Sequence, residues 1–279
     1  MSDPVPSIAE ADAMGEIAEI YGDIRRVFRV EVVNLVWRHL AIFPGALAWI
    51  WTMLRPLYVD GTFAREAAAL RAGLVLPQGQ LILAEALTVA GLTRSDLAGI
   101  KAVLAAYDRT NAMALVALTA AESRLDGATP ATPIGCMAAP SPPRKAVPEL
   151  PLPSLLSLDE MSPATAELVL KMNRFGTRRD DPILATMYRH LAHWPSYLER
   201  ALVVLEPLDG DGRLGAAVAD AEAIARARSA VLAARLPQPR AMLQPAMRTD
   251  ISDVLGRFTG DVIARMVVIC AVLRKASGP

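Results

Sequence analysis

The chain has 279 residues, and its 29 lysine and arginine residues balance 29 aspartate and glutamate residues, so the formal net charge is zero. A balanced charge gives no electrostatic reason to expect nucleic acid or an anionic membrane surface as a partner. Hydrophobic residues make up 53% of the chain and aromatic residues only 5%, and this alanine- and leucine-rich composition favours helices over strands.

Residues 1–19 are acidic and lack the basic start of a signal peptide. The stretch 32–54 is apolar, but it contains Arg38, His39 and Pro44, which predicts two buried helices and no membrane span. Two isolated cysteines, Cys136 and Cys270, make neither a disulfide framework nor a metal site. We therefore expect a protein of the reducing cytoplasm.

Apolar residues at helical spacing predict a series of helices in the first half of the chain. Ser7 with Glu10 is typical of a capping box, and so is Thr93 with Asp96. Pro44 is expected in the first turn of its helix. The predicted helices cover about 7–28, 32–42, 44–58, 62–76, 80–89 and 93–124.

Eight prolines fall between Pro130 and Pro153, so 129–157 cannot sustain a helix and is predicted to be an extended linker over the surface. Ser162 and Pro163 then predict a new helix start, with serine as N-cap. The predicted helices of this half cover about 163–175, 183–193, 195–205, 216–236 and 251–275. No stretch alternates long enough for a strand, which predicts an all-α fold.

The two halves are related by an internal repeat. Aligned without a gap, 37–57 and 188–208 share 9 of 21 residues, where unrelated segments would share one or two. The offset of 151 returns near the ends of the halves, where Tyr107 matches Phe258. This pattern predicts a tandem duplication with helical repeats at 1–128 and 158–279, joined by the linker 129–157.

Asp180 and Asp181 occur in the second copy only, directly before Pro182. An aspartate before a proline that opens a helix is a common N-cap, which is the structural interpretation. The functional interpretation is a carboxylate shielded between the repeats, where desolvation would make it a better base for a trapped water.

Asn111 is a polar residue within an apolar helix, and its match in the second copy is Val262. It is either a solvent-facing or helix-bonded side chain, or an amide that orients a water or a substrate group. Tyr107 lies one turn before it on the same face. Asn34 likewise matches an alanine, Ala185.

Trp37 and Tyr188 are matched aromatic residues, and such residues lie in a core more often than they line a pocket. His39 and His190 follow arginines in both copies, which favours a shared structural role. The chain contains no Gly-rich phosphate loop, no GxSxG, no HExxH and no Cys-x-x-Cys. The lack of a Cys-x-x-Cys dithiol excludes thiol–disulfide chemistry.

Several of these stretches resemble the group I 2-haloacid dehalogenases, the D-specific or non-stereospecific enzymes. They are Glu19–Arg25, Val33–Pro44 with its Trp-Arg-His-Leu-Ala core, and Asp181–Pro195 with Tyr-Arg-His-Leu-Ala and Trp-Pro. The resemblance covers nearly the whole chain, including the duplication and the linker. It implies an all-α pseudo-dimer with the active site between the repeats.

The resemblance also implies a mechanism, in which a water activated by an aspartate attacks C2 directly and expels halide with inversion, without a covalent intermediate, metal or cofactor. It maps the aspartate to Asp181, with Asp180 as the second choice, and the water-positioning asparagine to Asn111. The residues expected to bind substrate are Asn34, Trp37, Tyr107 and Tyr188.

The leading hypothesis is thus a cytoplasmic hydrolase that converts short 2-haloalkanoic acids to 2-hydroxy acids. Its expected partners are the haloacid substrate and a second copy of the chain in a homodimer. One alternative is a non-catalytic helical-repeat binding protein in which Asp181 is only an N-cap. The other is an enzyme of the same scaffold acting on another small carboxylic acid.

Overall fold

The computed structural model describes residues 5–30, 32–125, 151–237 and 243–278, and the regular structure within these ranges is helical. The helices are α1 (Gly15–Phe28), α2 (Leu35–Leu40), α3 (Ala46–Val59), α4 (Thr62–Gly73), α5 (Ala84–Val89), α6 (Arg94–Leu125), α7 (Pro163–Met172), α8 (Thr186–Leu191), α9 (Pro195–Gly210), α10 (Arg213–Ala233), α11 (Pro245–Arg257) and α12 (Ala264–Ala276). Short 3-10 helices, η1 (Glu10–Asp12) and η2 (Leu158–Glu160), precede α1 and α7, and a π-helix, η3 (Phe258–Ile263), joins α11 to α12.

The all-helical prediction is confirmed, and helix bounds recur at the offset of the sequence repeat. Helix α6 and the continuous run α11–η3–α12 begin 151 positions apart, at Arg94 and Pro245, and end 151 positions apart, at Leu125 and Ala276. Helices α2 and α8 follow the same offset. The helix order therefore agrees with a duplication, and the domain boundaries expected at 128/129 and 157/158 stay a prediction.

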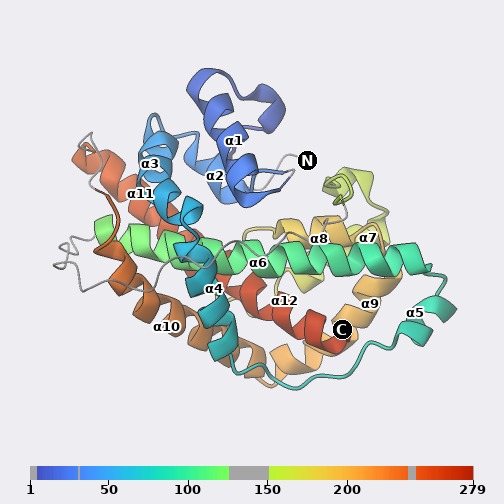
Figure 1. Cartoon of the computed structure of the whole chain (residues 1–279). Helices are drawn as coiled ribbons and strands as arrows, with labels where there is room; N and C mark the ends of the chain where they lie inside the picture. The colour runs from blue at the N-terminus through green and yellow to red at the C-terminus, as the bar shows by residue number, and fades with distance from the viewer. Residues whose placement is uncertain (1–4, 31, 126–150, 238–242, 279) are drawn as a thin grey trace.

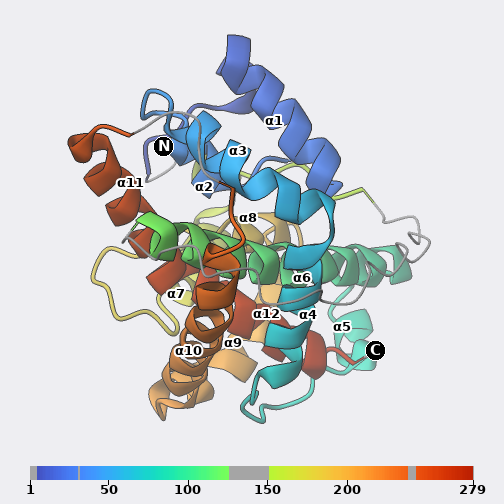
Figure 2. The ribbon, with the colours of Figure 1, turned by 60° about the vertical axis from the view of Figure 1, so that its left-hand side comes forward.

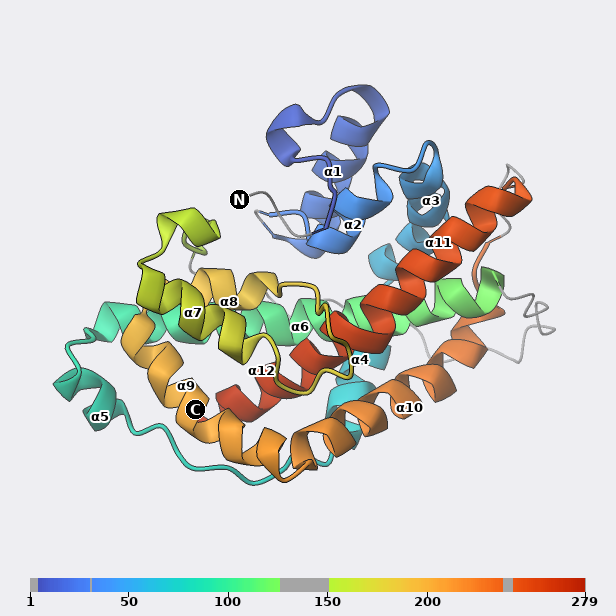
Figure 3. The ribbon, with the colours of Figure 1, turned by 180° about the vertical axis from the view of Figure 1, so that it is seen from behind.

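Helix α6 is the central element of the molecule. It packs against α4, α8, α10, α11 and α12 (Figure 1). The N-terminal helices α1, α2 and α3 lie on one side of α6, and α9 and α10 lie on the other (Figure 2). Seen from behind, the α11–η3–α12 run crosses α6 (Figure 3). The second half of α6 and almost all of α12 are buried, so the core extends along the contact between the two copies.

Two predicted helix starts are confirmed by their hydrogen bonds. The Thr93 N–H donates to Asp96 Oδ2 at 2.8 Å, and the Asp96 N–H donates to Thr93 Oγ1 at 3.2 Å, which opens α6. The Thr165 N–H donates to Ser162 Oγ at 3.2 Å and opens α7, with Pro163 in the first turn.

Several predicted helix starts differ from the structure, and in three of them the contacts show why. Ser7 and Glu10 do not form a capping box, because the Glu10 carboxylate accepts instead from the Val33 N–H and from Arg25, each at 2.7 Å. Pro44 lies before α3, which begins at Ala46. The helix predicted from 183 begins at Thr186, because the preceding segment is extended.

Residues 32–54 contain α2 and most of α3, as two separate buried helices. Within the described ranges, none of the helices combines the length and the apolar character needed to span a membrane. Of the predicted linker, 129–150 lies outside the described residues, as does Cys136. Its last part lies against α8, where Arg189 donates to the Leu156 carbonyl and His193 donates to the Ser154 carbonyl.

Candidate functional site

A small cavity lies where the two copies meet, with about 40 Å³ available to the centres of water molecules. Since one water requires about 10–15 Å³ by this measure, the space holds a few waters or a small molecule. The first copy contributes residues of α6 and of the start of α2. The second copy contributes residues of η3, of α12, and of the segment that leads into the start of α8. They are Asn34, Leu35, Val36, Tyr107, Asn111, Ala114, Ile183, Leu184, Ala185, Thr186, Met187, Phe258, Val262, Ile263 and Met266.

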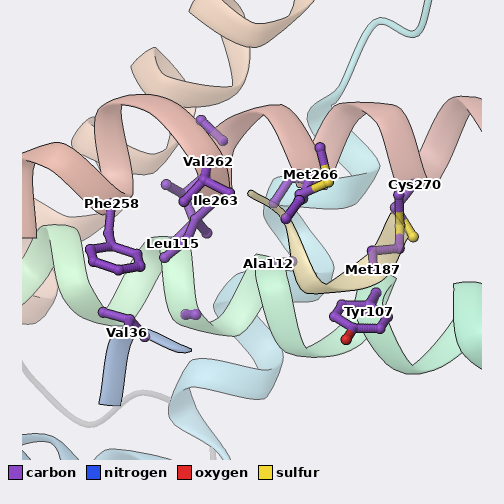
Figure 4. Packing of buried hydrophobic residues seen from close by; sticks show 14 of the residues in the cluster. Val36, Tyr107, Ala112, Leu115, Met187, Phe258, Val262, Ile263, Met266 and Cys270 are labelled. Atoms are coloured by element: carbon purple, nitrogen blue, oxygen red, sulfur yellow. The ribbon is translucent and has the colours of Figure 1, made fainter. Parts of the chain in front are cut away.

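The lining follows the internal repeat. Residues 151 positions apart face the same cavity in five pairs, which are Asn34 with Ala185, Leu35 with Thr186, Val36 with Met187, Tyr107 with Phe258, and Asn111 with Val262. Figure 4 shows the members of two of these pairs, with Val36 drawn below the Phe258 ring and Met187, the match of Val36, drawn above the ring of Tyr107, the match of Phe258. In four of the five pairs one member is polar and the other apolar, so the cavity has a polar side and an apolar side.

The polar side is held by α6 and the start of α8. Tyr107 and Asn111 lie one turn apart on α6, and the side chain of Asn111 is buried, with 6% exposure. Its Nδ2 group is shielded from solvent and has no hydrogen-bond partner among the described residues. A buried amide donor left unpaired is unfavourable by about 1–3 kcal/mol. An unpaired donor at a cavity wall therefore indicates a ligand or water that accepts from it.

The Tyr107 hydroxyl is part of a chain of polar groups. It lies 2.8 Å from Nδ1 of His190, a buried histidine of α8, and also interacts with the Thr186 side chain. Burial lowers the pKa of His190 to about 4, with smaller contributions from His193 and Arg189. Burial also raises the pKa of Tyr107 above its usual value. The tyrosine is thus neutral and able to donate a proton, while the histidine is neutral near pH 7.

The apolar side is formed by η3 and α12. The π-turn of η3 widens the helix locally, and such turns occur frequently at functional sites. It places Phe258, Val262 and Ile263 on the cavity, with Met266 one turn further along. These side chains make a wall that suits a methyl group or a large, weakly hydrated atom.

The extended segment before α8 is fixed by Asn173, whose Oδ1 accepts from the Ala185 N–H at 3.0 Å. Arg265 in turn donates to the Asn173 carbonyl at 2.7 Å and to the Phe175 carbonyl at 3.1 Å. Arg265 is fully buried and its Nε lies 2.9 Å from Asp261. This buried ion pair on the second copy therefore positions the backbone that carries Ala185 and Thr186 into the cavity.

Asp180 and Asp181 do not line this cavity, because both are exposed on the loop before it. The Asp181 side chain is 67% exposed and lies 3.3 Å from Arg179 and 3.1 Å from Arg257. It does not cap the following helix, since that helix begins at Thr186 and has no side-chain cap. In this arrangement neither interpretation of Asp181 from the sequence, base or N-cap, describes where the side chain lies.

The other predicted site residues divide into two groups. Asn34, Tyr107 and Asn111 line the cavity together. Trp37 and Tyr188 are fully buried in the core and do not line it. Trp37 packs against the rings of Phe28 and Trp51. For these two residues the structure agrees with the interpretation as core aromatics, which the sequence had left open.

Sequence reasoning missed Thr186, Asn173 and the role of His190. Thr186 could have been found by the same comparison that singled out Asn34, because its match in the first copy is the apolar Leu35. His190 was assigned a structural role because His39 matches it, yet the two rings have different partners. The His39 Nδ1–H donates to the Pro6 carbonyl at 2.6 Å. Nδ1 of His190 lies 2.8 Å from the hydroxyl oxygen of Tyr107, which lines the cavity.

No model of a known protein family matches the chain. It is 27% identical over 198 residues to a configuration-inverting 2-haloacid dehalogenase of Alcaligenes xylosoxydans xylosoxydans, an alignment that covers 70% of this chain and 66% of the relative. It is 26% identical over 210 residues to an (R)-2-haloacid dehalogenase of Pseudomonas putida, over 73% of this chain and 67% of the relative. The aligned part thus spans about two thirds of the length of each curated relative.

The fold matches that of solved D-2-haloacid dehalogenase structures. One, of a mutant, has a TM-score of 0.76 at 21% identity, over 99% of this chain and 97% of the other. A second, of a mutant in complex with D-2-CPA, has a TM-score of 0.73 over 98% and 94%, again at 21% identity. A third, in complex with L-LA, has a TM-score of 0.75 over 99% and 97% at the same identity. The resemblance to group I 2-haloacid dehalogenases is therefore confirmed in sequence and in fold.

Proposed function

We propose that this chain is a hydrolase of carbon–halide bonds that dehalogenates short 2-haloalkanoic acids in the cavity between its two copies. The observation that carries the proposal is the unpaired amide of Asn111, which faces the apolar wall of η3 and α12 across a space of small-molecule size. The named activity of both curated relatives supports the same substrate class.

The two sides of the cavity match the two halves of such a substrate. Hydrogen-bond donors on Asn34, Asn111 and Thr186 suit the carboxylate and an attacking water. The wall of Phe258, Val262 and Met266 suits the alkyl group and the halogen. Displacement at a saturated carbon requires the water in line with the leaving halide, and holding both in place accounts for much of the rate gain.

Direct attack by water with inversion at C2 is the mechanism we propose, and the configuration-inverting activity of one curated relative supports it. Single-turnover reaction in ¹⁸O-labelled water tests it, because direct attack puts the label in the first molecule of product. Label that appears first in the protein would show a covalent ester instead. Chiral analysis of the product acid measures inversion separately.

The activity itself is tested by halide release from each enantiomer of 2-chloropropionate. We expect release from at least one enantiomer, and a large loss of release when Asn111 is replaced by valine, its counterpart in the second copy. A folded wild-type protein that releases no halide from chloro- or bromopropionate would contradict the proposal. Assembly into a homodimer and cytoplasmic location stay predictions, the first measurable by sedimentation.

A second candidate function is binding of a small carboxylic acid without turnover. It is favoured by one observation, which is that none of the described residues lining the cavity is an Asp, Glu, Lys or Arg. Calorimetry with 2-chloropropionate and with lactate, alongside the halide assay, separates the two functions. Saturable binding of intact haloacid over hours, with no halide released, would identify the binding protein.

A further inference from the structure

A second cavity adjoins the cavity at the seam and offers about 30 Å³ to the centres of water molecules. Asn34, Tyr107 and Thr186 line both spaces. The second cavity is also lined by Val32, which lies between α1 and α2, and by Leu152, which lies before η2, and both residues are half-buried. It therefore joins the polar side of the seam cavity to side chains that solvent reaches.

The exposure of the seam cavity's own lining points to the same side. Among the described residues that line it, Asn34 and Thr186 are half-buried and the others are buried. Both half-buried residues also line the second cavity. Their matches in the repeat, Ala185 and Leu35, are only 2% and 6% exposed. The described wall of the seam cavity is thus accessible to solvent where it meets the second cavity.

The wall of the second cavity combines apolar side chains with a hydrogen-bond donor. Val32 and Ala106 are among its apolar members. Burial raises the pKa of Tyr107 and keeps its hydroxyl protonated, and this hydroxyl lies 2.8 Å from Nδ1 of His190. With the hydroxyl donating to Nδ1, the neutral imidazole of His190 carries its proton on Nε2.

This Nε2–H group is available to a ligand. Nε2 of His190 is buried and has no hydrogen-bond partner among the described residues, and the histidine lines the second cavity. None of the described residues that line this cavity is an Asp or Glu, so no described carboxylate in its wall repels an anion. A mostly apolar wall with a donor suits a small organic anion or a large, weakly hydrated one.

We propose that the second cavity is the passage through which the haloacid enters the seam cavity and the halide leaves it, with Asn34, Tyr107 and Thr186 at its inner end. The inference rests on the proposed dehalogenation. Because one water requires about 10–15 Å³ by this measure, the passage holds about two waters. An entering acid must therefore displace side chains at the outer end, and its rate of entry depends on their bulk.

The first experiment adds bulk at the outer end of the passage and measures halide release. Val32→Trp should lower kcat/KM for 2-bromopropionate by about 10-fold or more, because it slows association. The loss should be larger for 2-bromohexanoate, and the single-turnover rate at saturation should stay close to that of the wild type. Leu152→Ala should raise kcat/KM for the longer acid. Val231→Trp, at an exposed position of α10, is the control for added bulk and should behave as the wild type.

The second experiment measures access without catalysis. Met266→Cys places a thiol on the wall of the seam cavity, in a chain that also carries Cys136→Ser. Cys270 is fully buried and its pKa is raised by burial, so it reacts poorly. We expect methyl methanethiosulfonate to label the new thiol about 10-fold more slowly, or slower still, when Val32→Trp is added, in proportion to the slower entry. Adding Val231→Trp should leave the labelling rate unchanged.

The outcomes separate the passage from the function it rests on. Unchanged labelling and unchanged kcat/KM in a folded Val32→Trp protein would overturn the passage and leave dehalogenation standing. A wild-type protein that releases no halide, but whose thiol labelling is slowed by Val32→Trp, would overturn dehalogenation and keep the route of access. A fall in the single-turnover rate at saturation equal to the fall in kcat/KM would show that Val32→Trp disturbs the reaction itself, and would overturn the passage. Thermal unfolding checks the fold, and Leu152→Trp, on another segment, replaces Val32→Trp if that variant is unfolded.

Discussion

The Tyr107 hydroxyl oxygen lies 2.8 Å from Nδ1 of His190, which comes from the opposite copy of the repeat. The two residues are 83 positions apart in the chain, and their counterparts Phe258 and His39 meet through their rings alone. One pair of an otherwise repeated ring contact therefore has a hydrogen bond that the other pair lacks.

Replacing Asn111 by valine should separate activity from stability. The buried Nδ2 donor has no protein partner among the described residues, so the variant should be as stable as the wild type or more stable by about 1 kcal/mol. Halide release should fall by about 10- to 100-fold in kcat/KM, the loss expected for one hydrogen bond to a charged group. Chemical denaturation and the halide assay measure the two quantities. A strong loss of stability would show that Asn111 has a structural role.

His190 should make the protein less stable in mild acid. Its folded pKa of about 4 lies below the ordinary value of 6.5, so the unfolded chain takes up a proton first as the pH falls. The free energy of unfolding should therefore decrease between about pH 6.5 and 4, by up to about 3 kcal/mol from this residue alone. His190→Asn should show a flatter profile over the same range. His39, whose pKa burial also lowers, contributes in the same direction and is unchanged in that comparison.

Arg265→Met should strongly destabilise the protein, because it leaves the carboxylate of Asp261 buried without its cation. Loss of one partner of a buried pair costs about 3–5 kcal/mol. Activity should fall as well, since Arg265 holds the Asn173 carbonyl and Asn173 holds Ala185 at the cavity. Denaturant titration and the halide assay measure both effects. Adding Asp261→Leu should recover part of the stability, and a double variant no better than the single one would contradict this account.

Gly99→Ala should weaken the contact between α6 and the residues that precede α9. A Cβ atom at Gly99 would lie 2.8 Å from Trp194 Cζ2, and the Trp194 ring is held by its Nε1–H bond to Asp96 at 2.9 Å. Overpacking of this kind costs about 1–3 kcal/mol. Gly22→Ala in α1 is the control, since a Cβ there meets nothing within 4 Å, and it should stabilise by about 0.5–1 kcal/mol. Equal unfolding free energies for the two variants would argue against the predicted clash.

The sequence by itself determined the features that depend on local pattern. Helical periodicity and capping residues such as Thr93 and Ser162 gave the helices and several of their starts. Comparison of the two copies at a fixed offset singled out Asn34 and Asn111, because a polar residue matched to an apolar one is visible in the sequence, and helical spacing added Tyr107, one turn before Asn111. All three line the cavity.

Only the tertiary structure decided which side chains face one another. A helix turns about 100° per residue, so a start at Thr186 in place of 183 changes which residues point at the seam. That start depends on Asn173 and Arg265, which are distant in the sequence, and it leaves Asp181 outside with two arginines. His39 and His190 share the sequence context Arg-His-Leu-Ala, and their different partners come from other parts of the chain. Local pattern cannot encode such contacts, because they depend on how the two copies pack.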